Sequence, residues 1–314
     1  MDSTPTSICP PSDATVAEPG EAPSTPPRSR IDYSVELAYE VNGPADFVFN
    51  VQAAQTAQQR VLHESVVLAP DGAFDADTEP VYGNRLIRTH RESGPFKLTY
   101  AGSVEIAHRL VDPDAVVQVP IADLPAQVLH FMVSSRYCQV DQVQALAWRE
   151  FGQLAPGYRQ ASAVARWVGE RTKFQVGTST IETSCLETLR NGVGVCRDFA
   201  HLTIAMLRAL NYPARFVTGV DYGADRALGP PDFHAYAEAF IGDRWYLFDA
   251  TGLSPLTGLI RIGTGRDAAD VSFATIYGNV RTGMPLVAFS AVDDPARGLV
   301  TPAHTTLAVS TAAE

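Results

Sequence analysis

The chain reads Gly194-Val195-Cys196-Arg197-Asp198-Phe199-Ala200-His201-Leu202 at the point where a glycine-containing loop is expected to become a helix. The apolar residues that follow have helical spacing, which predicts a helix from Cys196 to about Leu210. The first turn of a helix has unpaired backbone N–H groups and the positive end of the helix dipole. Because both features favour the thiolate form of a cysteine, Cys196 is the candidate nucleophile.

Two later segments supply the other groups that a thiol nucleophile needs. His234 lies at the start of an apolar segment, and Asp249 ends another, Trp245-Tyr246-Leu247-Phe248-Asp249. A histidine can take the thiol proton and later give it to a leaving amine, while a carboxylate can fix the tautomer of the imidazole. The order cysteine, histidine, aspartate therefore predicts a catalytic triad of Cys196, His234 and Asp249.

Other reactive residue types close to Cys196 are expected to have structural roles. His201 points about 140° away from Cys196 around the helix, so it cannot fold back onto the thiol. Asp198 lies in the first turn, where an acid stabilises the helix dipole. Cys138 and Cys185 are predicted to be packing residues.

A short charged cluster follows the predicted catalytic strands, with Arg266, Asp267 and Asp270 as its members. It is interpreted either as part of the site or as a salt-bridged surface turn. The spacing of these acids is not that of a calcium loop, so we expect no metal and no other cofactor.

Composition limits the classes of function that remain. The chain has 314 residues, of which 46% are hydrophobic and 19% charged, which is typical of a globular protein of roughly two domains. The formal net charge of −11 argues against nucleic acid as a partner. Four cysteines are too few for a disulfide scaffold, and free thiols suit a cytoplasmic location. We expect neither a membrane span nor a secretory signal, because no apolar segment is long enough.

The pattern along the chain predicts four regions. Residues 1–30, which include Cys9, are rich in proline, serine and threonine and are predicted to form a disordered tail. Residues 31–115 alternate apolar and polar side chains, which predicts an antiparallel β-sandwich. Residues 116–290 have helices followed by strands, as expected of an α+β catalytic domain, and residues 291–314 are predicted to be a C-terminal tail.

Four motifs in this order resemble the transglutaminase-like superfamily: Gly-Val-Cys-Arg-Asp-Phe-Ala-His-Leu at 194–202, Asn-Tyr-Pro-Ala-Arg-Phe-Val-Thr-Gly at 211–219, His-Ala-Tyr-Ala-Glu at 234–238, and Phe-Asp-Ala-Thr at 248–251. The chain is most similar to a bacterial branch of cysteine proteases in that superfamily. The resemblance implies an N-terminal antiparallel β-sandwich followed by a papain-like core, and it extends over roughly residues 31–285.

Two positions depart from the pattern of many relatives, which have tryptophan at Tyr236 and proline at Ala250. Tyr236 is therefore a candidate pocket residue. The backbone N–H of Cys196 is one candidate donor to an oxyanion, and analogy with the family adds Arg136 and Tyr137.

The predicted reaction is attack of Cys196 on a peptide or protein amide, with formation of a thioester. Hydrolysis of that thioester is favoured over two alternatives. One is transglutaminase-type acyl transfer to an amine, since the same triad supports both reactions. The other is a non-catalytic peptide-binding module that retains the fold. The oligomeric state is left open.

Overall fold

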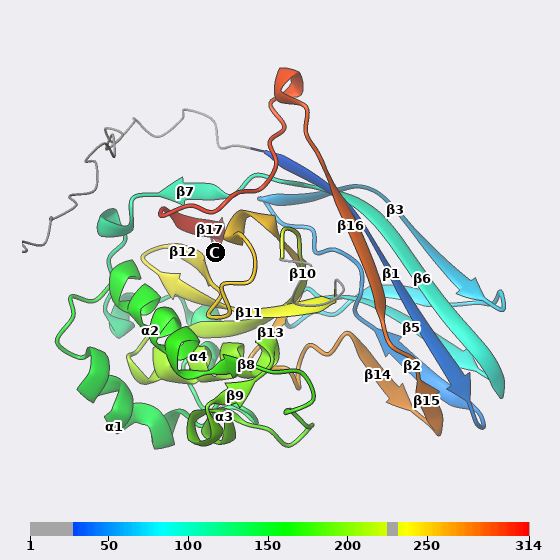
Figure 1. The fold of residues 1–314 in the computed structure, drawn as a ribbon, viewed down its shortest axis with the longest axis horizontal. Helices are drawn as coiled ribbons and strands as arrows, with labels where there is room; N and C mark the ends of the chain where they lie inside the picture. Colours follow the sequence, from blue (N-terminus) through cyan, green and yellow to red (C-terminus); the bar gives the residue numbers. More distant parts are fainter. Residues whose placement is uncertain (1–27, 225–231, 314) are drawn as a thin grey trace, which may run out of the picture.

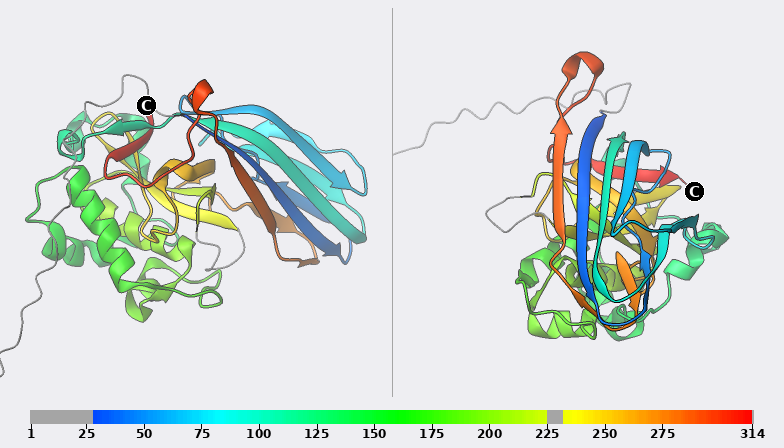
Figure 2. Two further views of the ribbon diagram at one scale, coloured as in Figure 1. Left: turned by 45° about the horizontal axis from the view of Figure 1, so that its top comes forward. Right: turned by 90° about the vertical axis from the view of Figure 1, so that its right-hand side faces the viewer.

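The computed structural model describes residues 28–224 and 232–313. A β-sandwich lies beside a lobe in which helices cover an antiparallel sheet (Figures 1 and 2). This α+β architecture, an antiparallel sandwich followed by a papain-like core, is the one that the sequence predicts. Within the described ranges, no helix is long and apolar enough to cross a membrane.

The sandwich has two antiparallel sheets around an apolar core. One sheet has the order β15-β1-β6-β3, with β16 also paired to β1, and the other has the order β14-β2-β5-β4. Its strands are β1 (Ser29–Val41), β2 (Ala45–Phe49), β3 (Gln59–Ala69), β4 (Asp75–Thr78), β5 (Arg85–Arg91), β6 (Gly94–Ile106), β14 (Ala274–Tyr277), β15 (Val280–Thr282) and β16 (Leu286–Val292). In β1, buried side chains alternate with more exposed ones along the strand, so the period-two pattern predicted the correct element.

The predicted limit of the catalytic domain at residue 290 differs from the structure. After the second lobe the chain returns to the sandwich, where β15 and β16 pair with β1 and β14 pairs with β2. These pairings cover the edges of β1 and β2, whose backbone groups would otherwise be unpaired.

The second lobe has helices on a six-stranded antiparallel sheet of order β13-β10-β11-β12-β17-β7. Its elements are β7 (Arg109–Val111), α1 (Val140–Phe151), α2 (Tyr158–Arg171), β8 (Lys173–Phe174), α3 (Cys185–Asn191), β9 (Val193–Gly194), α4 (Cys196–Ala209), β10 (Ala214–Asp221), β11 (Phe233–Ile241), β12 (Arg244–Phe248), β13 (Leu259–Gly265) and β17 (Ala308–Ala313). Short 3-10 helices connect them: η1 (Pro113–Ala115), η2 (Ile121–Asp123), η3 (Ala126–Phe131), η5 (Leu256–Gly258) and η6 (Pro295–Arg297).

Helix α4 is the central element of this lobe. It packs against α1, α2 and α3 and against strands β10 and β11 (Figure 1). From Asp198 to Ala209 every residue of α4 is buried, and the helix begins at Cys196 as its sequence predicts. The sheet and the surrounding helices therefore fix the end of α4 that carries the candidate nucleophile.

The tails require two corrections. The C-terminal tail predicted at 291–314 contains β16 residues and the whole of β17, which lies between β12 and β7 in the second sheet. Ala308 and Val309 are fully buried, so their burial stabilises this last strand. A disordered tail is predicted at 1–30, and residues 1–27 of it lie outside the described residues. The prediction is wrong for Ser29 and Arg30, which belong to β1.

Candidate active site

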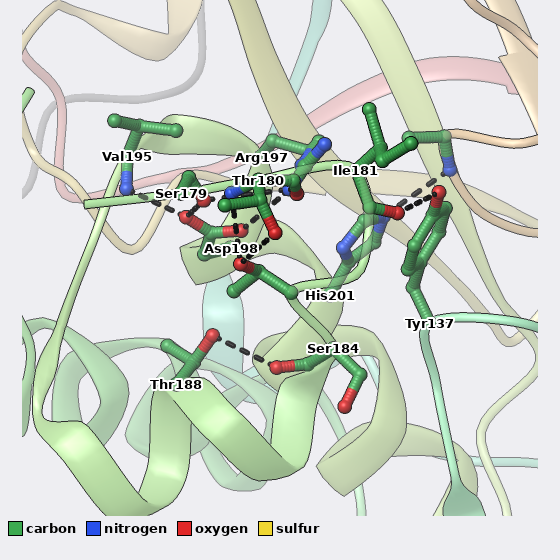
Figure 3. Close-up of polar contacts among 12 residues, drawn as sticks. Tyr137, Ser179, Thr180, Ile181, Ser184, Thr188, Val195, Arg197, Asp198 and His201 are labelled. Carbon is green, nitrogen blue, oxygen red and sulfur yellow. Dashed lines mark hydrogen bonds and ion pairs between the residues drawn. The ribbon is translucent and has the colours of Figure 1, made fainter. Parts of the chain in front are cut away.

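Cys196 is the first residue of α4, and its side chain is partly exposed. The loop before it is held by Asp198, whose Oδ2 accepts the Val195 backbone N–H at 2.9 Å. The same carboxylate is bound by the Ser179 hydroxyl and lies 3.3 Å from the Arg197 guanidinium (Figure 3). Asp198 thus satisfies a free N–H at the helix start, which is a more specific role than the dipole partner that the sequence predicts.

The glycine at 194 permits this arrangement. A Cβ on Gly194 would lie 2.8 Å from Cβ of Asp198, which is too close for two carbon atoms. The Gly194 carbonyl accepts the Gln175 N–H at 2.9 Å beside the parallel pair β8–β9. The nucleophile loop is therefore fixed on both sides, by a strand pair and by a buried carboxylate.

His234 is the second residue of β11 and lies opposite Gly219 of β10. Its Nε2 is 2.9 Å from Oδ2 of Asp249, and the Cys196 thiol lies close enough to its ring to contribute to a raised pKa of His234. The structure thus brings together the three residues of the predicted triad. Burial alone would lower the pKa of His234, but attraction to Asp249 and hydrogen bonds with Asp249 and Cys196 raise it well above its usual value.

Asp249 follows the last residue of β12 and has both carboxylate oxygens bound. Oδ2 faces His234, while Oδ1 accepts the Thr251 N–H at 2.9 Å and the Thr251 hydroxyl at 2.8 Å. Burial opposes ionisation of Asp249, yet the charge of His234 and these hydrogen bonds lower its pKa below the usual value. The carboxylate is therefore charged and oriented where it can fix the imidazole.

A second carboxylate faces the same imidazole. Asp221 ends β10, and its Oδ2 lies 3.6 Å from Nδ1 of His234. Burial raises the pKa of Asp221, partly offset by His234, and the neighbouring carboxylates of Asp249 and Asp232 raise it further. No local sequence motif marks Asp221 as a site residue. The register of β10 against β11, with Gly219 opposite His234, is the signal that places it there.

The candidate oxyanion donors on the segment before α1 have other contacts. The Tyr137 hydroxyl donates to the Ile181 carbonyl at 2.8 Å (Figure 3). The Tyr137 backbone N–H donates to Asp267 at 2.9 Å. The Arg136 guanidinium is exposed and lies 5.1 Å from the centre of the Tyr137 ring. The Tyr137 hydroxyl thus holds the loop before α3 in this structure.

Tyr236 lies two residues after His234 on β11, so the two side chains share one face of the strand. The two rings are stacked, with 6.3 Å between their centres. Tyr236 is buried in an apolar cluster with Val217 and Leu247, and burial strongly raises its pKa. It packs beneath the histidine ring instead of lining an open pocket.

His201 has the structural role that its position on the helix predicts. Its fully buried ring lies between Tyr137 and Phe216, with centre-to-centre distances of 4.9 and 5.0 Å. Its Nε2 is 3.2 Å from the backbone N of Ala268, which donates to it. Burial, together with the charges of Arg197 and Arg208, lowers the pKa of His201 well below its usual value, so the ring is neutral.

The two remaining described cysteines are packing residues, as predicted. Cys138 and Cys185 are both free and buried, and burial raises the pKa of Cys185 to about 11 and that of Cys138 further. Neither thiol is therefore available as a thiolate near neutral pH.

The charged cluster after β13 is a salt-bridged turn. Arg266 binds Asp270 at 2.8 Å, and Asp270 also accepts the Tyr82 hydroxyl from the sandwich at 3.0 Å. Asp267 orients the Tyr137 backbone. In the part of the chain that the structure describes, no group of three or more histidine, cysteine, aspartate or glutamate side chains could hold a metal ion.

Two family models match the sequence. The transglutaminase-like superfamily model matches residues 144–250, and the model of the bacterial transglutaminase N-terminal domain matches residues 30–127. The first range contains Cys196, His234 and Asp249, and the second corresponds to most of the sandwich.

A solved structure resembles nearly the whole chain. It is described as "a Putative Cysteine Protease from Cytophaga hutchinsonii", is 35% identical, and aligns over 90% of this chain and 97% of its own, with a TM-score of 0.84. An uncharacterized protein of Mycobacterium leprae is 36% identical over 115 residues, and one of Mycobacterium tuberculosis is 37% identical over 109 residues. The first match covers 41% of the Mycobacterium leprae protein and 35% of this chain. The second covers 35% of the Mycobacterium tuberculosis protein and 31% of this chain.

Proposed function

We propose that this chain, which belongs to the transglutaminase-like superfamily, is a cysteine-dependent hydrolase of peptide or protein amide bonds. The observation that carries the proposal is the buried pair of His234 and Asp249, joined at 2.9 Å, with the Cys196 thiol near enough to help raise the pKa of His234. A partly exposed thiol at a helix start, beside a histidine with a raised pKa, is the arrangement that activates a nucleophile.

In the proposed reaction, the Cys196 thiol gives its proton to His234 and attacks the amide carbonyl. Since Nε2 of His234 is bound by Asp249, Nδ1 is the nitrogen that exchanges the proton. The tetrahedral intermediate collapses as Nδ1–H donates to the departing amine, which leaves an acyl group as a thioester on Cys196. Water then attacks the thioester with His234 as base, releasing a carboxylic acid and restoring the thiol.

The backbone N–H of Cys196 is the proposed donor to the oxyanion, because the first N–H groups of a helix have no partner within the helix. The Tyr137 hydroxyl would have to leave the Ile181 carbonyl to serve as a second donor, and the Arg136 guanidinium lies over the Tyr137 ring. We therefore propose the Cys196 N–H as the principal donor.

The test is formation of an acyl-enzyme with p-nitrophenyl acetate, followed by intact mass measurement. We expect one acetyl group on the wild-type protein and on Cys185→Ser, which alters a buried thiol, but none on Cys196→Ala. Alkylation of Cys196 by iodoacetamide should be faster in the wild type than in His234→Gln, because the imidazole takes the thiol proton. Equal alkylation of the two proteins, together with no acetyl-enzyme, would favour a non-catalytic binding module.

Acyl transfer to an amine is the second candidate, because the triad geometry serves either resolving nucleophile. The two reactions differ in the product of the acetyl-enzyme, which is acetate with water and an amide with an added amine. Acetate as the main product at millimolar amine supports hydrolysis. The free thiols of the described residues support the further proposal of a reducing, cytoplasmic location.

A further inference from the structure

We propose that Asp221 recognises the amine that leaves, or attacks, the acyl group on Cys196, and that it favours amines carrying a positive charge. This inference rests on the proposed thioester chemistry and names the substrate class on the amine side of the bond. It begins from the position of a buried carboxylate at the catalytic histidine, on the ring nitrogen that Asp249 does not bind.

Geometry places Asp221 where the amine must be. Asp249 binds Nε2 of His234 at 2.9 Å, which leaves Nδ1 to exchange protons with the thiol and with the amine. Oδ2 of Asp221 lies 3.6 Å from this Nδ1. An amine nitrogen within hydrogen-bond reach of Nδ1 is therefore also within a few ångströms of the Asp221 carboxylate.

The Asp221 carboxylate has unused capacity to accept hydrogen bonds. Its side chain is only 9% exposed, and the distance to Nδ1 is longer than an ordinary hydrogen bond. Among residues 28–224 and 232–313, His234 is the only cationic side chain within 4.0 Å of the Asp221 carboxylate. A buried carboxylate in this position gains most from an added N–H donor, and a cationic donor also offsets the charge of Asp249 nearby.

The step balances without a further reactant. In the transfer direction, a neutral amine attacks the thioester carbon, the C–N bond forms and the C–S bond breaks. One amine proton passes to Nδ1 of His234 and then to the Cys196 sulfur, while a remaining N–H donates to Asp221. An amine that arrives as an ammonium first loses its extra proton to solvent. Hydrolysis of an amide uses the same contacts in the opposite order as the amine departs.

Asp221 attracts the cationic form during the approach, before that proton is lost. Attraction between a cation and a partly buried carboxylate is much stronger than in bulk water, whereas uncharged water gains no comparable attraction. Removal of the carboxylate should therefore weaken reaction with cationic amines and leave reaction with water nearly unchanged.

The experiment measures how the acetyl-enzyme, formed from p-nitrophenyl acetate, divides between water and pentane-1,5-diamine. For Asp221→Asn we expect the rate of amide formation to fall about tenfold or more, as for loss of one hydrogen bond to a charged group. The hydrolysis rate should stay within about threefold of wild type, a difference below 1 kcal/mol. Asp75→Asn is the matched control, since it removes the same charge from an exposed position on β4 of the sandwich and should leave the division unchanged.

Three results would overturn the inference. An equal fall in both rates would make Asp221 a residue that only positions His234. Two unchanged rates, or no amide from the wild type at saturating diamine, would exclude recognition of the amine. Absence of any acetyl-enzyme in the wild type would instead refute the proposed function itself, so the two failures are distinct.

Discussion

Two buried histidines, His201 on α4 and His234 on β11, differ in the charges that surround their rings. His234 lies between the carboxylates of Asp249 and Asp221, and its pKa is raised. His201 lies in an aromatic pocket between Tyr137 and Phe216, and its pKa is lowered by burial and by two arginines. Burial opposes the charge on both rings, so the neighbouring charges decide which ring can act as a base and as an acid.

The largest expected effect comes from His234→Gln, which keeps the size of the side chain but removes the proton acceptor. Acylation of Cys196 by p-nitrophenyl acetate should slow by about 10⁴-fold or more, as expected when a triad base is lost. The measurement is the burst of p-nitrophenol in stopped flow. His201→Gln is the control, and its burst should stay within about threefold of wild type. Equal losses in the two variants would remove the distinction between the two rings.

The second largest effect on the acylation rate is expected for Asp249→Asn. An asparagine amide can present its NH₂ group to Nε2, which favours the wrong tautomer of His234. The acylation rate should therefore fall by about 10³–10⁴-fold, with the fold intact. Thr251→Val removes one of the hydrogen bonds to Asp249 and should cost far less, on the order of tenfold. A mild effect of Asp249→Asn, similar to that of Thr251→Val, would contradict the proposed role of this carboxylate.

How far the sequence predicts this site depends on how local each signal is. The start of α4 at Cys196 follows from a glycine loop and helical spacing, and His234 and Asp249 follow from short motifs beside apolar strands. Asp221 has no such motif. Its position beside His234 depends on the register in which β10 pairs with β11, and no short stretch of sequence specifies that register.

The same reasoning explains the errors in the fold. Pairing of β16 with β1 joins residues more than 200 positions apart in the chain, and β17 joins β7 across a similar separation. A single sequence contains no local pattern that specifies such partners. The sandwich and the α+β order could be predicted because alternation and helical spacing are properties of each segment alone.

A smaller effect is expected at the helix behind Asp249. A Cβ on Gly169 of α2 would lie 2.5 Å from the Ala250 carbonyl oxygen, so Gly169→Ala must displace the segment that carries Asp249. Because small misplacements of a catalytic group are costly, the acylation rate should fall by about 10- to 100-fold. Glu170→Ala, at the next and exposed position of α2, should leave the rate unchanged. If Gly169→Ala also left it unchanged, close packing of α2 would not position Asp249.

The smallest expected effect concerns stability and tests the neutral state of His201. Its pKa is lowered in the folded protein, so the unfolded chain binds a proton below about pH 6.5 that the folded chain does not bind. Acid therefore favours unfolding. Below that pH, His201 alone should lower the free energy of unfolding by about 1.4 kcal/mol per pH unit until the ring titrates in the folded state.

His201→Phe keeps the aromatic packing and removes the proton site. The fall in the free energy of unfolding between pH 6.5 and 5 should therefore become shallower by about that slope. Urea unfolding at several pH values measures it, and His108, another buried histidine with a pKa of about 4, contributes equally to both proteins. Identical slopes for the wild type and His201→Phe would mean that His201 is protonated in the folded state, and the contrast with His234 would then rest on geometry alone.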